Sequence, residues 1–381
     1  MTIDTPLSVP ASRPVRPPRL RPARFADYPQ IHLVESTFFP DSLSDADRRG
    51  LFEDNPLWPR LAGTWPIGWV LEDADGRIVG SLNNIPSSYR IDGEERLCAN
   101  GHCWAVLEEY RGYATMLMDE LFNQEQPDLL VSAKVGSDAT PVWSAYARRV
   151  PVGDWGKAAY AITRYHGFAR TALQIKRIPL AAVVAPPLAL ALRVKDALTT
   201  RSLPGGPRSV EFAEGDGFDA RFDAFWWELV EQNPGMLLGV RDSAALRWHY
   251  GVPMRAKRVW VLTATRGGLL RAYCVLKLHL RPTGVRSLKL VDYQSVEPDV
   301  DLLPGLLTMA LRRSAVENCS VLEHHGCGIP RMRSFDELAP YRVDKPSWSF
   351  YYCATDPTFE ARLAEPGVWD PSEYDGDSSY K

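Results

Sequence analysis

The stretch Cys98–Gln124 constrains this chain more than any other, because three different patterns follow one another in it. An apolar run ends in the acidic pair Glu108 and Glu109, and a turn containing Arg111-Gly112 comes next. Apolar residues then recur at the spacing of one helix face, namely Ala114, Leu117, Met118, Leu121 and Phe122. We therefore expect a strand, a turn and a helix that starts directly after the turn.

The start of such a helix is suited to an anion. Its first N–H groups have no partner within the helix, and the helix dipole places partial positive charge at the same end. Pyrophosphate groups bind proteins in this way. The turn at residues 111–116 therefore predicts an anion-binding site.

The neighbouring segments predict strands and helices on both sides of this stretch. Gly68–Leu82 has the pattern of a hairpin that turns at Asp75-Gly76. Asp128–Lys134 has the pattern of a strand, and Ala139–Arg148 that of a second helix. The expected order is hairpin, strand, turn, helix, strand and helix.

This order and its turn resemble the acyl-CoA-binding core of the GNAT acyltransferase superfamily, whose turn has the pattern Arg/Gln-x-x-Gly-x-Gly/Ala. Arg111 matches the first position, while Ala114 and Met116 stand where the pattern has its small residues. The segment Leu20–Asp27 also resembles the opening of many GNAT domains. The resemblance covers about residues 20–177 and implies an acyl-CoA-binding domain there.

The second half of the chain repeats this order. A hairpin, a strand, a helix and a further strand are expected at Arg258–Leu278, Ser287–Val296, Leu302–Val316 and Ser320–His325. Glu297, Asp299 and Asp301 stand in place of the Arg-Gly turn, and carboxylates there repel a pyrophosphate. The second half therefore resembles a GNAT-type unit that lacks a phosphate site, and we expect one acyl-CoA per chain.

Together these patterns predict an α/β (α+β) protein of two GNAT-like units, each with a mixed, mostly antiparallel central sheet flanked by helices. The expected divisions are a disordered Pro/Arg-rich lead-in at 1–19, an N-terminal GNAT domain at 20–177, a linker with a core helix at 178–207 and a degenerate GNAT-like domain at 208–381. The apolar segment Ile178–Leu192, which contains Pro186-Pro187, supplies that core helix.

Composition restricts the partners. The 381 residues carry a net charge of −3 and are 45% hydrophobic, which favours a soluble protein and gives no support for nucleic-acid binding. No apolar stretch has membrane-spanning length, and the N-terminus has no signal-peptide core, so we expect a cytoplasmic protein without a membrane partner.

The cysteines, at positions 98, 103, 274, 319, 327 and 353, are expected to be reduced, mostly buried thiols. His324, His325 and Cys327 lie close together, but too few ligands converge to predict a metal site.

Acyl transfer from a thioester to an amine needs an anchored thioester, a base for the amine and an acid for the leaving thiolate. The resemblance implies that Trp104, Ala105 and Val106 hold the pantetheine arm through their backbone. It further implies that the turn holds the pyrophosphate, through Arg111, Gly112, Tyr113, Ala114, Thr115 and Met116.

The proton-transfer groups are less closely specified. Tyr146 stands at the position of the superfamily's tyrosine, four residues before Val150-Pro151, and is the candidate general acid. Candidates for the general base are His102, Glu108 and Glu109, and His102 has a pKa suited to the task. Asp292, in an apolar strand of the second half, is a candidate for base, acceptor binding or a structural bond, because a buried carboxylate needs a partner.

The resulting hypothesis is an N-acyltransferase, with acetyl as the favoured group, that acts from acyl-CoA on a primary amine of a small metabolite such as an amino sugar or amino acid. One alternative is a tandem GNAT-like aminoacyltransferase that uses aminoacyl-tRNA. Another is a GNAT-like binding or assembly subunit without catalysis.

Overall fold

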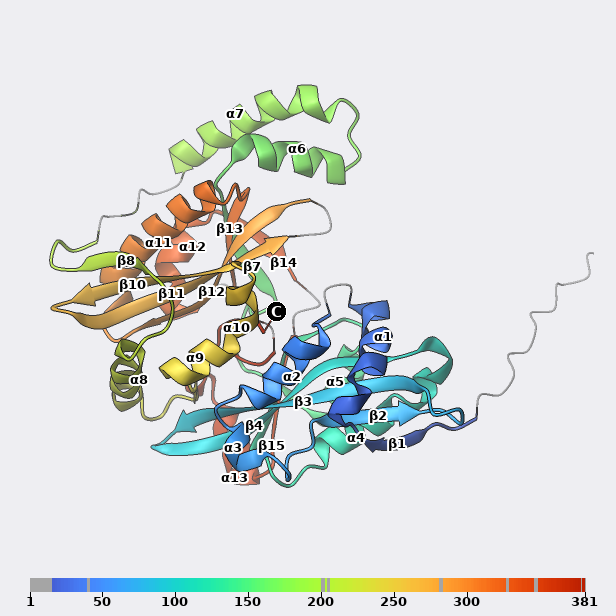
Figure 1. Cartoon of the computed structure of the whole chain (residues 1–381). Helices are drawn as coiled ribbons and strands as arrows, with labels where there is room; N and C mark the ends of the chain where they lie inside the picture. The colour runs from blue at the N-terminus through green and yellow to red at the C-terminus, as the bar shows by residue number, and fades with distance from the viewer. Residues whose placement is uncertain are drawn as a thin grey trace, which may run out of the picture.

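The computed structural model describes residues 16–39, 42–199, 203, 206–280, 284–326, 329–345, 349–377, 379 and 380. Residues 1–15 of the expected lead-in and Cys327 lie outside them. The described chain forms two mixed sheets with helices packed on them (Figure 1). Two large apolar clusters fill the spaces between the sheets and their helices, and a third lies beneath the helices of the second half.

The first sheet runs in the order β1 (Arg19–Pro22), β2 (Gly68–Glu72), β3 (Ile78–Ile91), β4 (Glu94–Val106), β5 (Leu129–Val135), β15 (Ser349–Ala354) and β6 (Arg148–Arg149). Neighbours are antiparallel except β4 and β5, which are parallel. The short strand β9 (Leu238–Gly239) pairs with the end of β3. The expected hairpin is confirmed, since β2 and β3 pair across a turn in which Gly76 has a φ of +78°.

The second sheet runs in the order β8 (Glu211–Gly215), β10 (Val259–Arg266), β11 (Leu269–Leu280), β12 (Arg286–Ser295), β13 (Val321–His325), β7 (Lys157–Ile162) and β14 (Tyr341–Asp344). Here too one neighbouring pair, β12 and β13, is parallel and the other pairs are antiparallel. The two sheets therefore follow one pattern, which confirms the predicted repeat of mixed, mostly antiparallel units.

Each sheet contains a strand from the other half of the chain in its main order, in addition to the short strand β9 at the end of β3. Strand β7 comes from the first half and pairs with β13 and β14 in the second sheet. Strand β15 comes from the second half and pairs with β5 and β6 in the first. The predicted boundary at residues 178–207 therefore divides the sequence, but β7 and β15 each pair in the sheet of the other half and so join the two sheets.

The helices cover the sheets as the apolar patterns require. Around the first sheet lie α1 (Tyr28–Phe38), α2 (Asp45–Glu53), α3 (Trp58–Leu61), α4 (Thr115–Phe122), α5 (Thr140–Tyr146) and α13 (Pro357–Leu363). Around the second lie α8 (Arg221–Gln232), α9 (Ser243–His249), α10 (Gly251–Arg255), α11 (Asp299–Val316) and α12 (Arg333–Leu338). Helix α4 buries Leu117, Met118 and Leu121, which is the apolar face read from the sequence.

One helix differs from its prediction. The segment expected to supply a core helix belongs to α7 (Ala181–Thr199), which forms a hairpin with α6 (Tyr165–Ile175) at the far side of the second sheet (Figure 1). Ala185 and Ala189 face α6, while larger apolar residues such as Val183 and Leu190 are exposed. The core-helix prediction was wrong because α7 packs mainly through its small residues, while its larger apolar side chains such as Val183 and Leu190 are exposed. No helix in the described ranges is long and apolar enough to cross a membrane.

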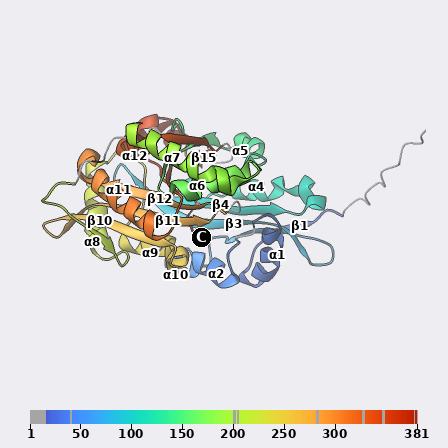
Figure 2. The same cartoon turned by 90° about the horizontal axis from the view of Figure 1, so that it is seen from above.

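The last described residues lie between the two sheets, as both views show (Figures 1 and 2). The segment from Trp369 to Tyr380 is largely buried, and its side chains contact both units. Glu373 forms ion pairs with Lys134 of β5 and Lys289 of β12, at 3.1 and 3.5 Å. Ser379 Oγ lies 2.6 Å from His249 Nε2. This tail segment therefore delivers polar side chains to the centre of the molecule.

Candidate active site

A cavity opens where β4 and β5 separate. The two strands pair only at Cys98–Asn100 and Leu129–Val131, and beyond that point they diverge. The space between them has a volume of about 880 Å³ and is lined by residues of β4, β5, α5, the end of α1 and the tail segment. A splayed pair of parallel strands thus creates a site between its own main chains.

The predicted phosphate turn lies at one end of this cavity. It forms a 3-10 helix, η2 (Glu108–Tyr113), and α4 begins at Thr115. Arg111, Ala114 and Thr115 line the cavity, and the side chains of Arg111 and Thr115 are exposed. Gly112, Tyr113 and Met116 are not among the lining residues, and Tyr113 and Met116 pack against the apolar cluster of the first sheet. The cationic side chain and the start of the helix therefore lie at the cavity's edge.

The predicted pantetheine strand lines the same cavity, through Trp104, Ala105 and Val106. The indole N–H of Trp104 is buried and has no hydrogen-bond partner among the described residues. A buried donor without a partner costs free energy.

Strand β4 is irregular just before these residues. Cys103 has a φ of +52°, and the pairing of β3 with β4 shifts register between Ser81 and Asn83. Neighbouring side chains of a regular strand point to opposite faces, but a bulge re-aims one of them. As a result His102 and Cys103 line one cavity, with Cys103 Sγ 3.2 Å from His102 Nε2.

The other ring nitrogen of His102 contacts the tail segment. His102 Nδ1 lies 2.7 Å from Asp377 Oδ2, and the ring is 3% exposed. Burial opposes the charged imidazolium, but Cys103 and the hydrogen bond with Asp377 outweigh it and raise the pKa of His102 to about 10. His102 was a predicted base. Asp377 was missed, and it lies 275 positions further along the chain.

Three other predicted residues are not brought to this cavity. The hydroxyl of Tyr146 donates to Asp119 Oδ1 at 2.6 Å, and its ring stacks on Phe122. That hydrogen bond is the main cause of a raised pKa for Tyr146. Glu108 and Glu109 begin η2 and are exposed to solvent. None of these three residues lines the cavity, because the Tyr146 hydroxyl is bonded to Asp119 of α4 and the two glutamates are exposed on η2.

Asp292 lies in a buried ion-pair cluster. Its carboxylate accepts hydrogen bonds from Arg241 Nε at 3.1 Å, the Tyr273 hydroxyl at 3.0 Å and Ser372 Oγ at 2.8 Å. Asp375 also pairs with Arg241, at 3.3 Å. Asp292 is fully buried. Of the three roles expected for it, these contacts fit the structural bond.

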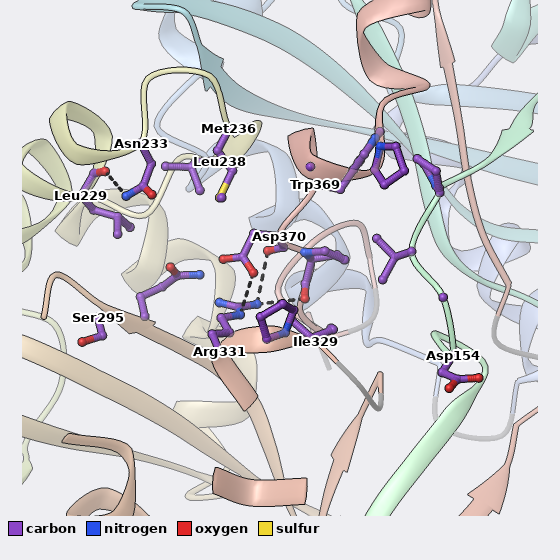
Figure 3. Close-up of a pocket in the computed structure, with 18 residues that line it drawn as sticks. Asp154, Leu229, Asn233, Met236, Leu238, Ser295, Ile329, Arg331, Trp369 and Asp370 are labelled. Carbon is purple, nitrogen blue, oxygen red and sulfur yellow. Dashed lines mark hydrogen bonds and ion pairs between the residues drawn. The ribbon is translucent and has the colours of Figure 1, made fainter. Parts of the chain in front are cut away.

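The second sheet has an opening at the corresponding place. A pocket of about 610 Å³ lies where β12 and β13 separate, between Ser295 and the Ile329–Arg331 segment. Arg331 projects into it and pairs with Asp370 at 2.9 Å (Figure 3). The guanidinium also donates to the carbonyl oxygen of Pro371 at 2.9 Å. Arg331, with Asp370 and Pro371 of the tail segment, therefore lines the pocket at this place in the second sheet.

The described ranges contain no group of three or more His, Cys, Asp or Glu side chains that could hold a metal ion. His324 and His325 are buried at the end of β13, where burial lowers their pKa values to about 4 and about 2. His325 packs edge-on against Trp155. The two rings therefore belong to the core in the described structure.

Solved structures of other proteins share this architecture. A GCN5-related N-acetyltransferase from Anabaena variabilis superimposes with a TM-score of 0.54 at 10% identity, over 89% of this chain and 73% of that one. One from Kribbella flavida gives 0.52 at 12%, over 89% and 71%. N-myristoyltransferase from Saccharomyces cerevisiae, solved with bound myristoyl-CoA, gives 0.53 at 7%, over 92% and 81%.

At the level of sequence, no protein-family model matches the chain, and no curated protein matches it significantly. At identities of 7 to 12%, the structural likeness concerns the fold. The predicted resemblance is thereby confirmed: this chain has the GNAT fold, in a two-unit form.

Proposed function

We propose that the chain is an N-acyltransferase that takes its acyl group from acyl-CoA. The observation that carries this proposal is the 880 Å³ cavity between the splayed strands β4 and β5, with Arg111 and the start of α4 at its edge. A guanidinium and a helix N-terminus suit a pyrophosphate, and the backbone of Trp104, Ala105 and Val106 on the splayed strand is the part that would hold the pantetheine arm. The GNAT fold of the chain supports the same assignment.

The acceptor in this proposal is a primary amine of a small metabolite, such as an amino sugar or amino acid, and the favoured donor is acetyl-CoA. His102 is the group that supports amine chemistry, because it lines the cavity and can exchange a proton through Nε2. The setting proposed for this reaction is the cytoplasm. Isothermal titration with acetyl-CoA and longer acyl-CoAs tests the proposed donor. If none of them gives a measurable heat of binding, acyl-CoA is refuted as the donor.

The cavity edge can be tested with a substitution that does not weaken the helix. Thr115→Glu should lower acyl-CoA affinity by about fivefold or more, because one added like charge near a pyrophosphate costs on the order of 1 kcal/mol or more. Thr115 is exposed, and a carboxylate in the first turn stabilises a helix. The control is Thr115→Gln, because glutamine has nearly the same size as glutamate but no charge. This variant should bind acyl-CoA normally. Equal affinity in both variants would place the phosphates elsewhere.

A second measurement concerns stoichiometry. We expect one acyl-CoA per chain, because the second unit has carboxylates in place of the Arg-Gly turn, and the guanidinium of Arg331 in its pocket is already paired with Asp370. Glu297, at the start of the helix that follows, is already paired with Arg266 and Arg271. Calorimetry or native mass spectrometry should give a ratio of one, and a ratio of two would contradict the assignment.

A further inference from the structure

Three side chains in the cavity form a hydrogen-bonded row. Cys103 Sγ is 3.2 Å from His102 Nε2, and His102 Nδ1 is 2.7 Å from Asp377 Oδ2. A nucleophile, a base and a carboxylate that orients the base are the parts of a covalent catalytic triad. The carboxylate fixes the ring so that Nε2 faces the sulfur.

The backbone at Cys103 is unusual in a way that serves this row. A φ of +52° is uncommon for a residue with a side chain and is costly to maintain. It is this bulge that turns the thiol toward the same cavity as His102. Backbone strain of this kind clusters at functional sites.

The other cysteines that the structure describes have different surroundings. Burial raises the thiol pKa of Cys98 and Cys274, and it raises that of Cys319 to about 11. Cys353 is partly exposed, and burial raises its pKa as well. Cys103 differs because an imidazole contacts its sulfur and because it borders the cavity. A thiolate is the reactive form of cysteine, and an adjacent imidazolium stabilises it.

We propose that Cys103 is a nucleophile that accepts the acyl group, so that transfer passes through an acyl-cysteine enzyme. This inference rests on the proposed function and adds a covalent step to it. Its substrate class is a thioester, and the second substrate is an amine. Asp377 is a positioning residue in this scheme, since it acts through His102.

In the first step the Cys103 thiolate attacks the carbonyl carbon of acyl-CoA. A C–S bond to Cys103 forms and the C–S bond to CoA breaks. The departing CoA thiolate takes the proton from His102 Nε2. The products are acyl-Cys103, neutral His102 and free CoA thiol.

In the second step the amine attacks the acyl carbon of the acyl-cysteine. His102 Nε2 accepts a proton from the amine nitrogen, and the C–S bond to Cys103 breaks as the amide forms. The thiolate and the imidazolium are restored. No oxidant, reductant or further reactant is consumed.

Exchange between free and bound CoA tests this scheme without knowledge of the amine. Labelled CoA is incubated with unlabelled acyl-CoA, using the acyl-CoA that binds best by calorimetry, and no amine is added. An acyl-cysteine enzyme transfers its acyl group back to labelled CoA, whereas direct transfer to an amine gives no exchange. We expect exchange with the unaltered chain and a loss of at least about 100-fold in Cys103→Ala.

The matched control is Cys353→Ala, which removes another partly exposed thiol outside the cavity and should exchange normally. Calorimetry on each variant separates binding from chemistry. If the unaltered chain binds acyl-CoA but shows no exchange, the acyl-cysteine is refuted while the acyltransferase assignment stands. Undiminished exchange in Cys103→Ala also refutes Cys103 as the nucleophile. If no acyl-CoA binds, the proposed function itself fails.

Discussion

Replacing His102 by glutamine should slow CoA exchange by about 10²–10⁴-fold, the usual contribution of a positioned acid–base group. A glutamine side chain can still form a hydrogen bond with Asp377, but it cannot release a proton to the departing CoA thiolate. Acyl-CoA affinity should change little, because the phosphates lie at the Arg111 end of the cavity in the proposed arrangement. The measurements are exchange rate and calorimetric affinity on the same preparation.

His166 provides the control for this experiment. It is an exposed histidine on α6, on the hairpin beyond the second sheet, so His166→Gln should leave exchange unchanged. A normal exchange rate in a folded His102→Gln variant would remove His102 from the chemistry. A loss of affinity alone would assign it to binding instead.

Local patterns were sufficient to predict most of the first unit. The β2–β3 hairpin follows from two apolar runs on either side of the Asp75-Gly76 turn, and α4 follows from its apolar face. The repeat in the second half was predicted for the same reason, since each element has its own periodicity. Such patterns involve residues that are close in sequence, so they can be recognised without knowledge of the fold.

The exchange of β7 and β15 could not be predicted in this way. Both are short apolar strands, and either could pair with the sheet of its own half. Their pairing depends on contacts between positions such as Ala161 and Leu322, which are far apart in the chain. Helix α7 was misread for a related reason, because an apolar helix is normally buried on all sides.

The candidate site shows the same limit. His102 was identified because it lies on the strand of the motif. Cys103 is its neighbour in sequence, but neighbours on a strand do not normally meet. A regular strand would have separated the two side chains, and only the positive φ at Cys103 brings them together. Asp377 gave no signal, because the tail segment that carries it is fixed by contacts with both units.

A further large effect concerns the fold. Asp292→Asn should lower the free energy of unfolding by about 3 kcal/mol, the lower end of the range for breaking a buried ion pair. The substitution keeps the shape of the side chain but removes one of the two carboxylates that face the buried Arg241. Asp375 alone, at 3.3 Å, then remains opposite the guanidinium. Urea unfolding followed by tryptophan fluorescence should show a lower midpoint.

An exposed ion pair gives the matched comparison. Asp219 and Arg221 lie 2.8 Å apart with both side chains about half exposed, so Asp219→Asn should change the unfolding free energy by less than about 1 kcal/mol. The comparison also decides the role of Asp292. If it held the acceptor amine, Asp292→Asn would keep its stability and lose acyl transfer, with CoA exchange intact. If it holds Arg241, stability falls first, because a buried cation that loses a partner has no water to replace it.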